Sequence, residues 1–176
     1  MEISIRPESS HDYESVEDLV QAAFANEPLS DQSESLLVHR LRNSPSFVPE
    51  LSLIAEHEGR IIGHILLTEI IVQNDSQIFP GLALAPVSVH PEYQGKGIGS
   101  KLIEEAHRRA TTLGYPFIVL IGHESYYPRF GYEPAGKYGI EFPFKVPPQN
   151  AMVKALAEEG LNGLRGRVQY DKAFFS

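Results

Sequence analysis

Three glycines within five residues, Gly95, Gly97 and Gly99, stand between an apolar stretch and an amphipathic one. Glycine reaches backbone dihedrals closed to other residues, and its missing side chain lets a ligand approach the main chain. The amphipathic stretch predicts a helix from Ile98, whose unpaired amides and positive dipole end face this turn. The pattern indicates a diphosphate site, where Ser100 either bonds a phosphate oxygen or serves the helix end.

Two common phosphate loops do not fit this spacing. The Walker pattern has four residues between its glycines and then Gly-Lys-Ser/Thr, whereas Lys96 lies between glycines here. The dinucleotide fingerprint Gly-x-Gly-x-x-Gly belongs in an early βαβ unit with an acidic residue about 20 positions further on. Here the order is Gly-x-Gly-x-Gly, deep in the chain. The sequence therefore disfavours both a Walker-type phosphate loop and a dinucleotide oxidoreductase.

The run Gln94-Gly95-Lys96-Gly97-Ile98-Gly99 resembles the Gln/Arg-x-x-Gly-x-Gly/Ala coenzyme A loop of the GNAT superfamily of N-acetyltransferases. Residues 124–132, Glu-Ser-Tyr-Tyr-Pro-Arg-Phe-Gly-Tyr, resemble the Tyr-x-x-x-Gly-Phe/Tyr segment that closes the cofactor site in that superfamily. The two segments occur in the right order with a predicted strand between them. Residues 50–64 resemble the substrate-side hairpin of bacterial YhbS-like predicted acetyltransferases.

The resemblance implies that acetyl-CoA is the co-substrate. Residues 87–89 would then pair their backbone groups with the pantetheine arm as an added strand, or else form an ordinary interior strand. A backbone amide of the strand at Ser88 and Val89 would stabilise the oxyanion. The implied coenzyme-binding residues are Val87, Ser88, Val89, Gln94, Gly95, Lys96, Gly97, Ile98, Gly99, Ser100 and Tyr127.

The resemblance also implies the catalytic groups. Its general-acid tyrosine falls on Tyr127, four residues before Gly131. A phenol with a pKa of about 10 can hand a proton to a departing thiolate, although Tyr127 could instead only contact the cofactor sulfur. A base often lies near the end of a strand beside the cofactor strand, which falls on Glu69. The full set of base candidates is Glu50, Glu69, His64, His90, His123 and Glu124; Arg129, Phe130, Gly131 and Tyr132 are expected to be structural.

The expected reaction is direct transfer of acetyl to a primary amine of a small molecule or peptide. With no cysteine in the chain, no acetyl-cysteine intermediate can form, which favours a ternary complex. One alternative is a sensor of the same fold that binds acyl-CoA without catalysis, and it would not need Tyr127. Another is an acyltransferase that uses longer acyl-CoA or a non-amine acceptor.

Composition limits the remaining possibilities. The net charge of −8 offers no basic face for nucleic acid and attracts cationic substrates. No spacing suggests a metal site. The chain shows no signal-like start and no run of about 18 apolar residues, so a cytoplasmic protein that does not enter membranes is expected. By analogy with the superfamily, the chain could form a homodimer.

The 176 residues suit one domain, 1–176, of the α/β class and α+β type. A mixed, mostly antiparallel, splayed sheet flanked by helices is the implied GNAT fold. Residues 136–176 are less determined and would complete the acceptor side. Predicted strands are 2–6, 51–56, 61–72, 82–89, 117–121, 138–146 and 166–170; predicted helices lie within 10–23, 32–41, 98–113, 125–130 and 151–159.

Overall fold

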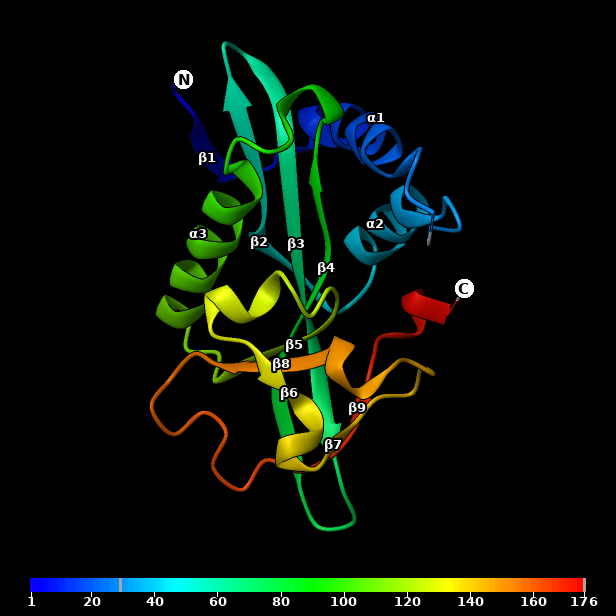
Figure 1. The fold of residues 1–176 in the computed structure, drawn as a ribbon, viewed down its shortest axis with the longest axis vertical. Coiled ribbons are helices and arrows are strands. Elements are labelled where there is room, and N and C mark those ends of the chain that lie inside the picture. Colours follow the sequence, from blue (N-terminus) through cyan, green and yellow to red (C-terminus); the bar gives the residue numbers. More distant parts are fainter. Residues whose placement is uncertain (29, 176) are drawn as a thin grey trace.

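The computed structural model describes residues 1–28 and 30–175. Within them, strands form one mixed sheet in the order β1-β2-β3-β4-β5-β8-β6, with β9 pairing β3 and β7 (Figure 1). Most pairs are antiparallel, but β4 runs parallel to β5 and β7 runs parallel to β9. The predicted fold class is confirmed. The strands are β1 (Ser4–Pro7), β2 (Phe47–His57), β3 (Arg60–Gln73), β4 (Ile78–Val89), β5 (Phe117–Ile121), β6 (Glu133–Pro134), β7 (Ile140–Glu141), β8 (Ala151–Ala155) and β9 (Gly166–Gln169).

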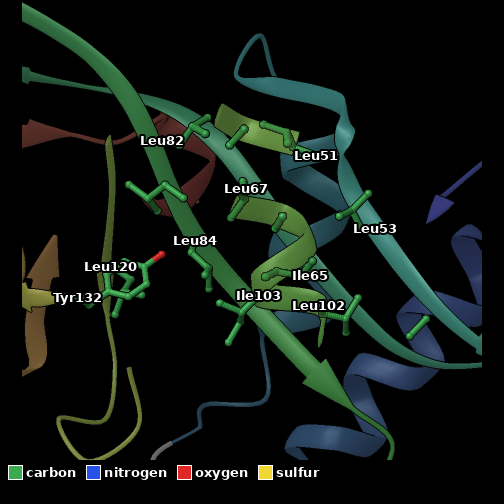
Figure 2. Close-up of a cluster of buried hydrophobic side chains, with 14 of the residues drawn as sticks. Leu51, Leu53, Ile65, Leu67, Leu82, Leu84, Leu102, Ile103, Leu120 and Tyr132 are labelled. Carbon is green, nitrogen blue, oxygen red and sulfur yellow. The ribbon is translucent and has the colours of Figure 1, made fainter. Parts of the chain in front are cut away.

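Helices cover both faces of this sheet. Helix α3 (Ile98–Thr112) lies on one side of β2 to β4, and α1 (Tyr13–Phe24) and α2 (Glu34–Arg42) lie on the other (Figure 1). Figure 2 shows the core between the sheet and α3, where Leu102 and Ile103 meet strand residues such as Ile65 and Leu67. Each such aliphatic side chain contributes about 1.5–3 kcal/mol when fully buried.

Strand β3 sends alternate residues to opposite faces. Ile65 and Leu67 pack toward α3, whereas Leu66 packs with residues of α1 and α2. Because side chains in a strand alternate strictly, His64 and Thr68 share the α1/α2 face, and Glu69 shares the α3 face. This alternation decides which polar residues of β3 can reach a site on either side.

Strands β4 and β5 separate soon after they meet. Their pairing covers only Leu82 with Ile118 and Ala83 with Val119. On its other side β4 stays paired with β3 up to Val89, across a register irregularity between Leu84 and Val87. The far half of β4 therefore has an edge without a strand neighbour, as the predicted splayed sheet requires.

The predicted helix over 151–159 is wrong. Residues Ala151–Ala155 form β8, which lies between β5 and β6. Its run Ala-Met-Val is compatible with either structure locally, and pairing along the free edge of β5 decides for the strand. The predicted strand over 138–146 is reduced to β7, and prolines 143, 147 and 148 follow it. The strand predicted at 166–170 is confirmed as β9, but it is not an edge strand, because it pairs with β3 on one side and with β7 on the other.

Residues 1–28 and 30–175 contain neither a helix that could span a membrane nor a cluster of side chains that could bind a metal ion. None of the helices there has the length and apolar character needed to cross a membrane. No group of three or more histidine or acidic side chains in the same residues could hold a metal ion.

Candidate active site

The glycine loop has the conformation that its sequence indicates. Gly95 and Gly97 have φ values of +78° and +81°, where other residues are strained, and Gly97 is the N-cap of α3. A Cβ at either position would meet nothing within 4 Å, so the loop is open rather than packed. The first helical amide to bond back is that of Lys101, to the Gly97 carbonyl at 3.1 Å. The preceding amides of the first turn are free to bind an anion.

A cavity of about 310 Å³ lies over this loop. Arg129 lines it, with its guanidinium 4.8 Å from the centre of the Tyr126 ring and hydrogen bonds to the carbonyls of Ser125 and Tyr126. Arg129 thus adds a cation to a site already rich in amides. The residues lining this cavity are Val89, Tyr93, Gln94, Gly95, Gly97, Ile98, Gly99, Ser100, Tyr126 and Arg129.

A second cavity, of about 450 Å³, follows the free edge of β4. Val89 and Gln94 line both cavities, and the Gln94 side-chain amide donates to the Val89 carbonyl at 3.0 Å. The two cavities are therefore neighbours at the end of β4. The larger one is lined by Ala23, Phe24, Glu27, Ser30, Glu34, Leu37, Leu84, Ala85, Pro86, Val87, Ser88, Val89, Gln94, Ile121, Gly122, His123 and Tyr127.

Tyr127 stands at the wall of the larger cavity. Its ring packs edge-to-face against Tyr126 and Tyr132, with centroids 5.1 and 5.9 Å away. Burial raises the pKa of the Tyr127 phenol to about 12. The hydroxyl therefore stays protonated throughout the neutral range and is available as a donor.

Gly122 makes room for the Tyr127 ring. A Cβ on Gly122 would lie 2.3 Å from Cε2 of that ring. The Gly122 backbone cannot easily retreat, because its N–H donates to the Asn150 carbonyl and its carbonyl accepts from the Asn150 side chain. Sequence reasoning did not single out Gly122, whose role depends on a ring that approaches from a later turn.

Gly122→Ala is expected to lower kcat about 30-fold by displacing the Tyr127 hydroxyl, since misplacing a reacting group by about 1 Å costs on the order of 100-fold. Affinity for acetyl-CoA should stay within about threefold, because the phosphate loop is untouched. Steady-state kinetics and calorimetry measure the two effects. Gly136→Ala, where the added methyl meets nothing within 4 Å, is the matched control; equal kcat values for both variants would contradict this role.

The base candidates are scattered. Glu69 is exposed on the α3 face and accepts a hydrogen bond from the Tyr115 hydroxyl at 2.7 Å. Glu69 lines neither cavity. His123 lines the larger cavity, and His64 is fully buried on β3 beside Ser88 of β4. Glu50, His90 and Glu124 also lie outside the described lining of both cavities.

The tail does not reach this site. The described residues that line the larger cavity end at Tyr127, and none comes from 136–175. The end of the chain packs instead on α2, where Arg40 donates to the Ala173 carbonyl at 3.0 Å. Two acidic residues line the larger cavity instead: Glu27, between α1 and α2, and Glu34, the first residue of α2. Nothing local in the sequence marks these two carboxylates as cavity residues.

Acid is expected to destabilise the fold through His64. Burial lowers the pKa of the His64 imidazole from 6.5 to about 4. A depressed pKa gives stability that is complete above pH 6.5 and is lost as the pH falls through about 4, by at most about 3 kcal/mol. Burial also lowers the pKa of the His107 imidazole to about 4, so protonation of His107 destabilises the fold over the same pH range. Urea unfolding at about pH 7 and about pH 4.5 should show a smaller loss for His64→Gln than for the wild type; an equal loss would contradict it.

An open sheet whose central parallel strands diverge beside a glycine-rich helix start defines the acyltransferase class that binds acyl-CoA. A family model described as an acetyltransferase (GNAT) domain matches residues 4–135. The chain belongs to the GNAT acetyltransferase family.

Several relatives extend the match. The uncharacterized N-acetyltransferase YhbS of Escherichia coli K12 is 29% identical over 171 residues, 97% of each chain. The uncharacterized N-acetyltransferase YjhQ of the same strain is 38% identical over 118 residues, 66% of this chain and 65% of YjhQ.

Two crystal structures with bound ligands have the same fold. Escherichia coli YhbS in complex with CoA has a TM-score of 0.88 at 27% identity, covering 99% of this chain and 92% of that one. A GNAT family acetyltransferase from Brucella melitensis in complex with acetyl-CoA has a TM-score of 0.80 at 30% identity, covering 98% of both chains.

Proposed function

We propose that this protein transfers acetyl from acetyl-CoA directly to a primary amine of a small molecule or peptide while both substrates are bound. The observation that carries the proposal is that the two cavities share Val89 and Gln94 as lining residues. A ligand bound over the glycine loop would pass these residues and follow β4 to Tyr127. The ligands of the YhbS and Brucella structures support acetyl-CoA as the donor.

The donor would be held by backbone and by one cation. The diphosphate suits the free amides at the start of α3 and the nearby Arg129 guanidinium. The pantetheine arm suits the unpaired edge at residues 87–89, which it would extend as a further strand. A backbone amide at Ser88 or Val89 would stabilise negative charge on the thioester oxygen.

Direct transfer requires the acceptor nitrogen to lose two protons. Its ammonium group first gives one proton to a base or to water, and its electron pair then attacks the thioester carbonyl. As the carbon–sulfur bond breaks, Tyr127 donates its proton to the departing sulfur and regains one, directly or through water, from the nitrogen of the new amide. No cysteine is present to carry the acetyl group, so no acetyl-cysteine intermediate can form.

The charge of the larger cavity supports a cationic acceptor. Glu27 and Glu34 are its acidic lining residues, and among its described lining residues there is no lysine or arginine. Ser30 donates to both oxygens of Glu34 at 2.7 Å, which holds that carboxylate in place without neutralising it. Apolar residues such as Phe24 and Leu37 complete the wall. An amine with a second cationic group, or with a basic neighbour in a peptide, fits this chemistry.

Glu34→Gln is expected to raise KM for a diamine about 10-fold and to change kcat less than about twofold, because it removes ground-state attraction. KM for a monoamine of equal length should change much less. Initial rates with a matched diamine and alkylamine give both numbers. Glu158→Gln, which makes the same charge change at an exposed loop position, is the control; a KM unchanged by Glu34→Gln would remove this carboxylate from acceptor binding.

The proposal is tested by thiol release from acetyl-CoA with a panel of polyamines, amino acids, aminoglycosides and peptides. Release that depends on the acceptor supports it. Tight acetyl-CoA binding without release by any acceptor would favour a sensor, and a preference for longer acyl-CoA or for alcohols would change the substrate class. The proposal requires a compartment that contains acetyl-CoA, for which we propose the cytoplasm.

A further inference from the structure

A row of buried polar side chains lies directly behind the larger cavity. Ser52 donates its hydroxyl proton to Glu8 at 2.6 Å, and the Ser52 oxygen lies 3.0 Å from Nε2 of His64. A serine has one hydroxyl proton, so the proton between Ser52 and His64 must belong to the histidine. His64 is therefore the tautomer with hydrogen on Nε2, and its Nδ1 carries a free lone pair.

The Glu8 carboxylate sets the direction of the Ser52 hydrogen bond, and Arg42 holds that carboxylate in place. Arg42 donates to both oxygens of Glu8 at 2.9 Å and to Glu17 at 2.7 Å, and it stacks over the Tyr13 ring at 4.1 Å. The side chains of Glu8 and Arg42 are 1% and 3% exposed. A carboxylate held by a bidentate guanidinium can only accept hydrogen bonds. Ser52 must therefore donate to Glu8 and accept from His64, and not the reverse.

Two buried polar atoms without hydrogen-bond partners belong to neighbouring residues at the cavity end of the row. His64 Nδ1 and Ser88 Oγ are both buried, and neither has a hydrogen-bond partner. The two residues are register partners on β3 and β4, so their side chains share a face with Cβ atoms about 5 Å apart. One atom is an acceptor and the other a donor, and a turn of the Ser88 side chain or one bridging water would link them. Ser88 also lines the cavity that contains Tyr127.

We propose that Ser88 binds the acceptor nitrogen and relays its proton, with His64 as the positioning residue that takes the proton behind it. This inference rests on the proposed function. In the relay, Ser88 turns its hydroxyl to donate to His64 Nδ1, directly or through one water, and its lone pairs then face the acceptor in the cavity. The nitrogen–hydrogen bond of the ammonium breaks, its electron pair stays on nitrogen, and the proton goes to Ser88 Oγ. The original Ser88 proton moves to Nδ1, so Ser88 is unchanged.

The surroundings of His64 suit a brief positive charge. Glu8, Glu17 and Arg42 together carry one net negative charge, and His64 Nε2 lies 4.0 Å from a Glu8 oxygen. A proton on Nδ1 therefore neutralises the cluster. Because burial lowers the His64 pKa to about 4, the ring is neutral before turnover and returns the proton through Ser88 once the product leaves.

Ser88→Ala is expected to lower kcat/KM for the acceptor about 100-fold, the lower range for positioned proton transfer. The Kd of acetyl-CoA should change less than about threefold. Thr68→Val is the matched control, because Thr68 Oγ1 is also buried and unpartnered on the same face but lines neither cavity. Thr68→Val should keep wild-type rates.

Two His64 variants separate the relay from a structural role. His64→Asn keeps a polar group near the Nδ1 position and gives up the link to Ser52, whereas His64→Gln keeps the link and loses the Nδ1 lone pair. The relay predicts that both variants are slowed about 100-fold, because neither amide can take a proton at the Nδ1 position. A role limited to holding Ser52 and Glu8 predicts that only the Asn variant is slow, because the Gln variant keeps that link.

The pH profile supplies the decisive readout. In Ser88→Ala and His64→Gln, solvent must deprotonate the amine, so kcat/KM should rise about tenfold per pH unit until the amine pKa is reached. The wild type should level off earlier. Wild-type turnover combined with rates within about twofold for both variants would overturn the relay. Absence of wild-type turnover with every amine would overturn the proposed function and the relay with it.

Discussion

Replacing Tyr127 by phenylalanine is expected to lower kcat about 100-fold while acetyl-CoA affinity stays within about twofold. The phenylalanine ring keeps the edge-to-face contacts with Tyr126 and Tyr132. What disappears is the phenol hydroxyl at the wall of the larger cavity, whose pKa burial raises to about 12. Stopped-flow or steady-state thiol release measures kcat, and calorimetry with acetyl-CoA measures affinity.

Tyr115→Phe is the matched control for this change. Tyr115 is also half-buried with its pKa raised to about 12, but it bonds Glu69 on the far face of the sheet. Its loss should leave kcat unchanged. If Tyr127→Phe keeps kcat within about threefold, Tyr127 only contacts the sulfur and another group protonates it.

Gly97→Asp is expected to weaken acetyl-CoA binding about 100-fold more than Gly97→Asn does. Asp and Asn have nearly the same shape, and both tolerate the left-handed conformation that Gly97 adopts at +81°. They differ in one negative charge beside the amides that would hold the diphosphate. Calorimetric titration of both variants with acetyl-CoA isolates that charge.

Salt provides an internal check on the Gly97 pair. Repulsion between an exposed carboxylate and a diphosphate is screened, so the gap between the variants should narrow as ionic strength rises. Stability measured by urea unfolding should be alike for the two. Equal affinities at low salt would mean that no anion binds at the start of α3.

The parts of the fold that the sequence predicts well are those with local signals. The glycine loop, α3 and the apolar strand β5 follow from residue types within a short window. Strand β8 does not, because Ala-Met-Val-Lys-Ala is neutral between helix and strand and is decided by its pairing with β5 and β6. Local propensity is overruled there by a partner distant in sequence.

The candidate site also contains some residues that the sequence predicts and others that it does not. The motif positions Gln94 and Tyr127 meet at one cavity as expected. Alternation along β3 puts Glu69 on the same face as Leu67, but the sequence does not tell which face carries the cavity. Glu34 and Arg129 join the site through the packing of α2 and of the turn after β5. Side chains brought in by separate elements carry no short-range signal.

The most direct test is to incubate the protein with acetyl-CoA labelled in the acetyl group and with a diamine, and to follow both products by mass spectrometry. We expect one labelled acetyl group on the amine for every free CoA released. The same stoichiometry should hold, at a much lower rate, for Tyr127→Phe. Bound acetyl-CoA with no labelled amine, from any acceptor in the panel, would contradict acetyl transfer.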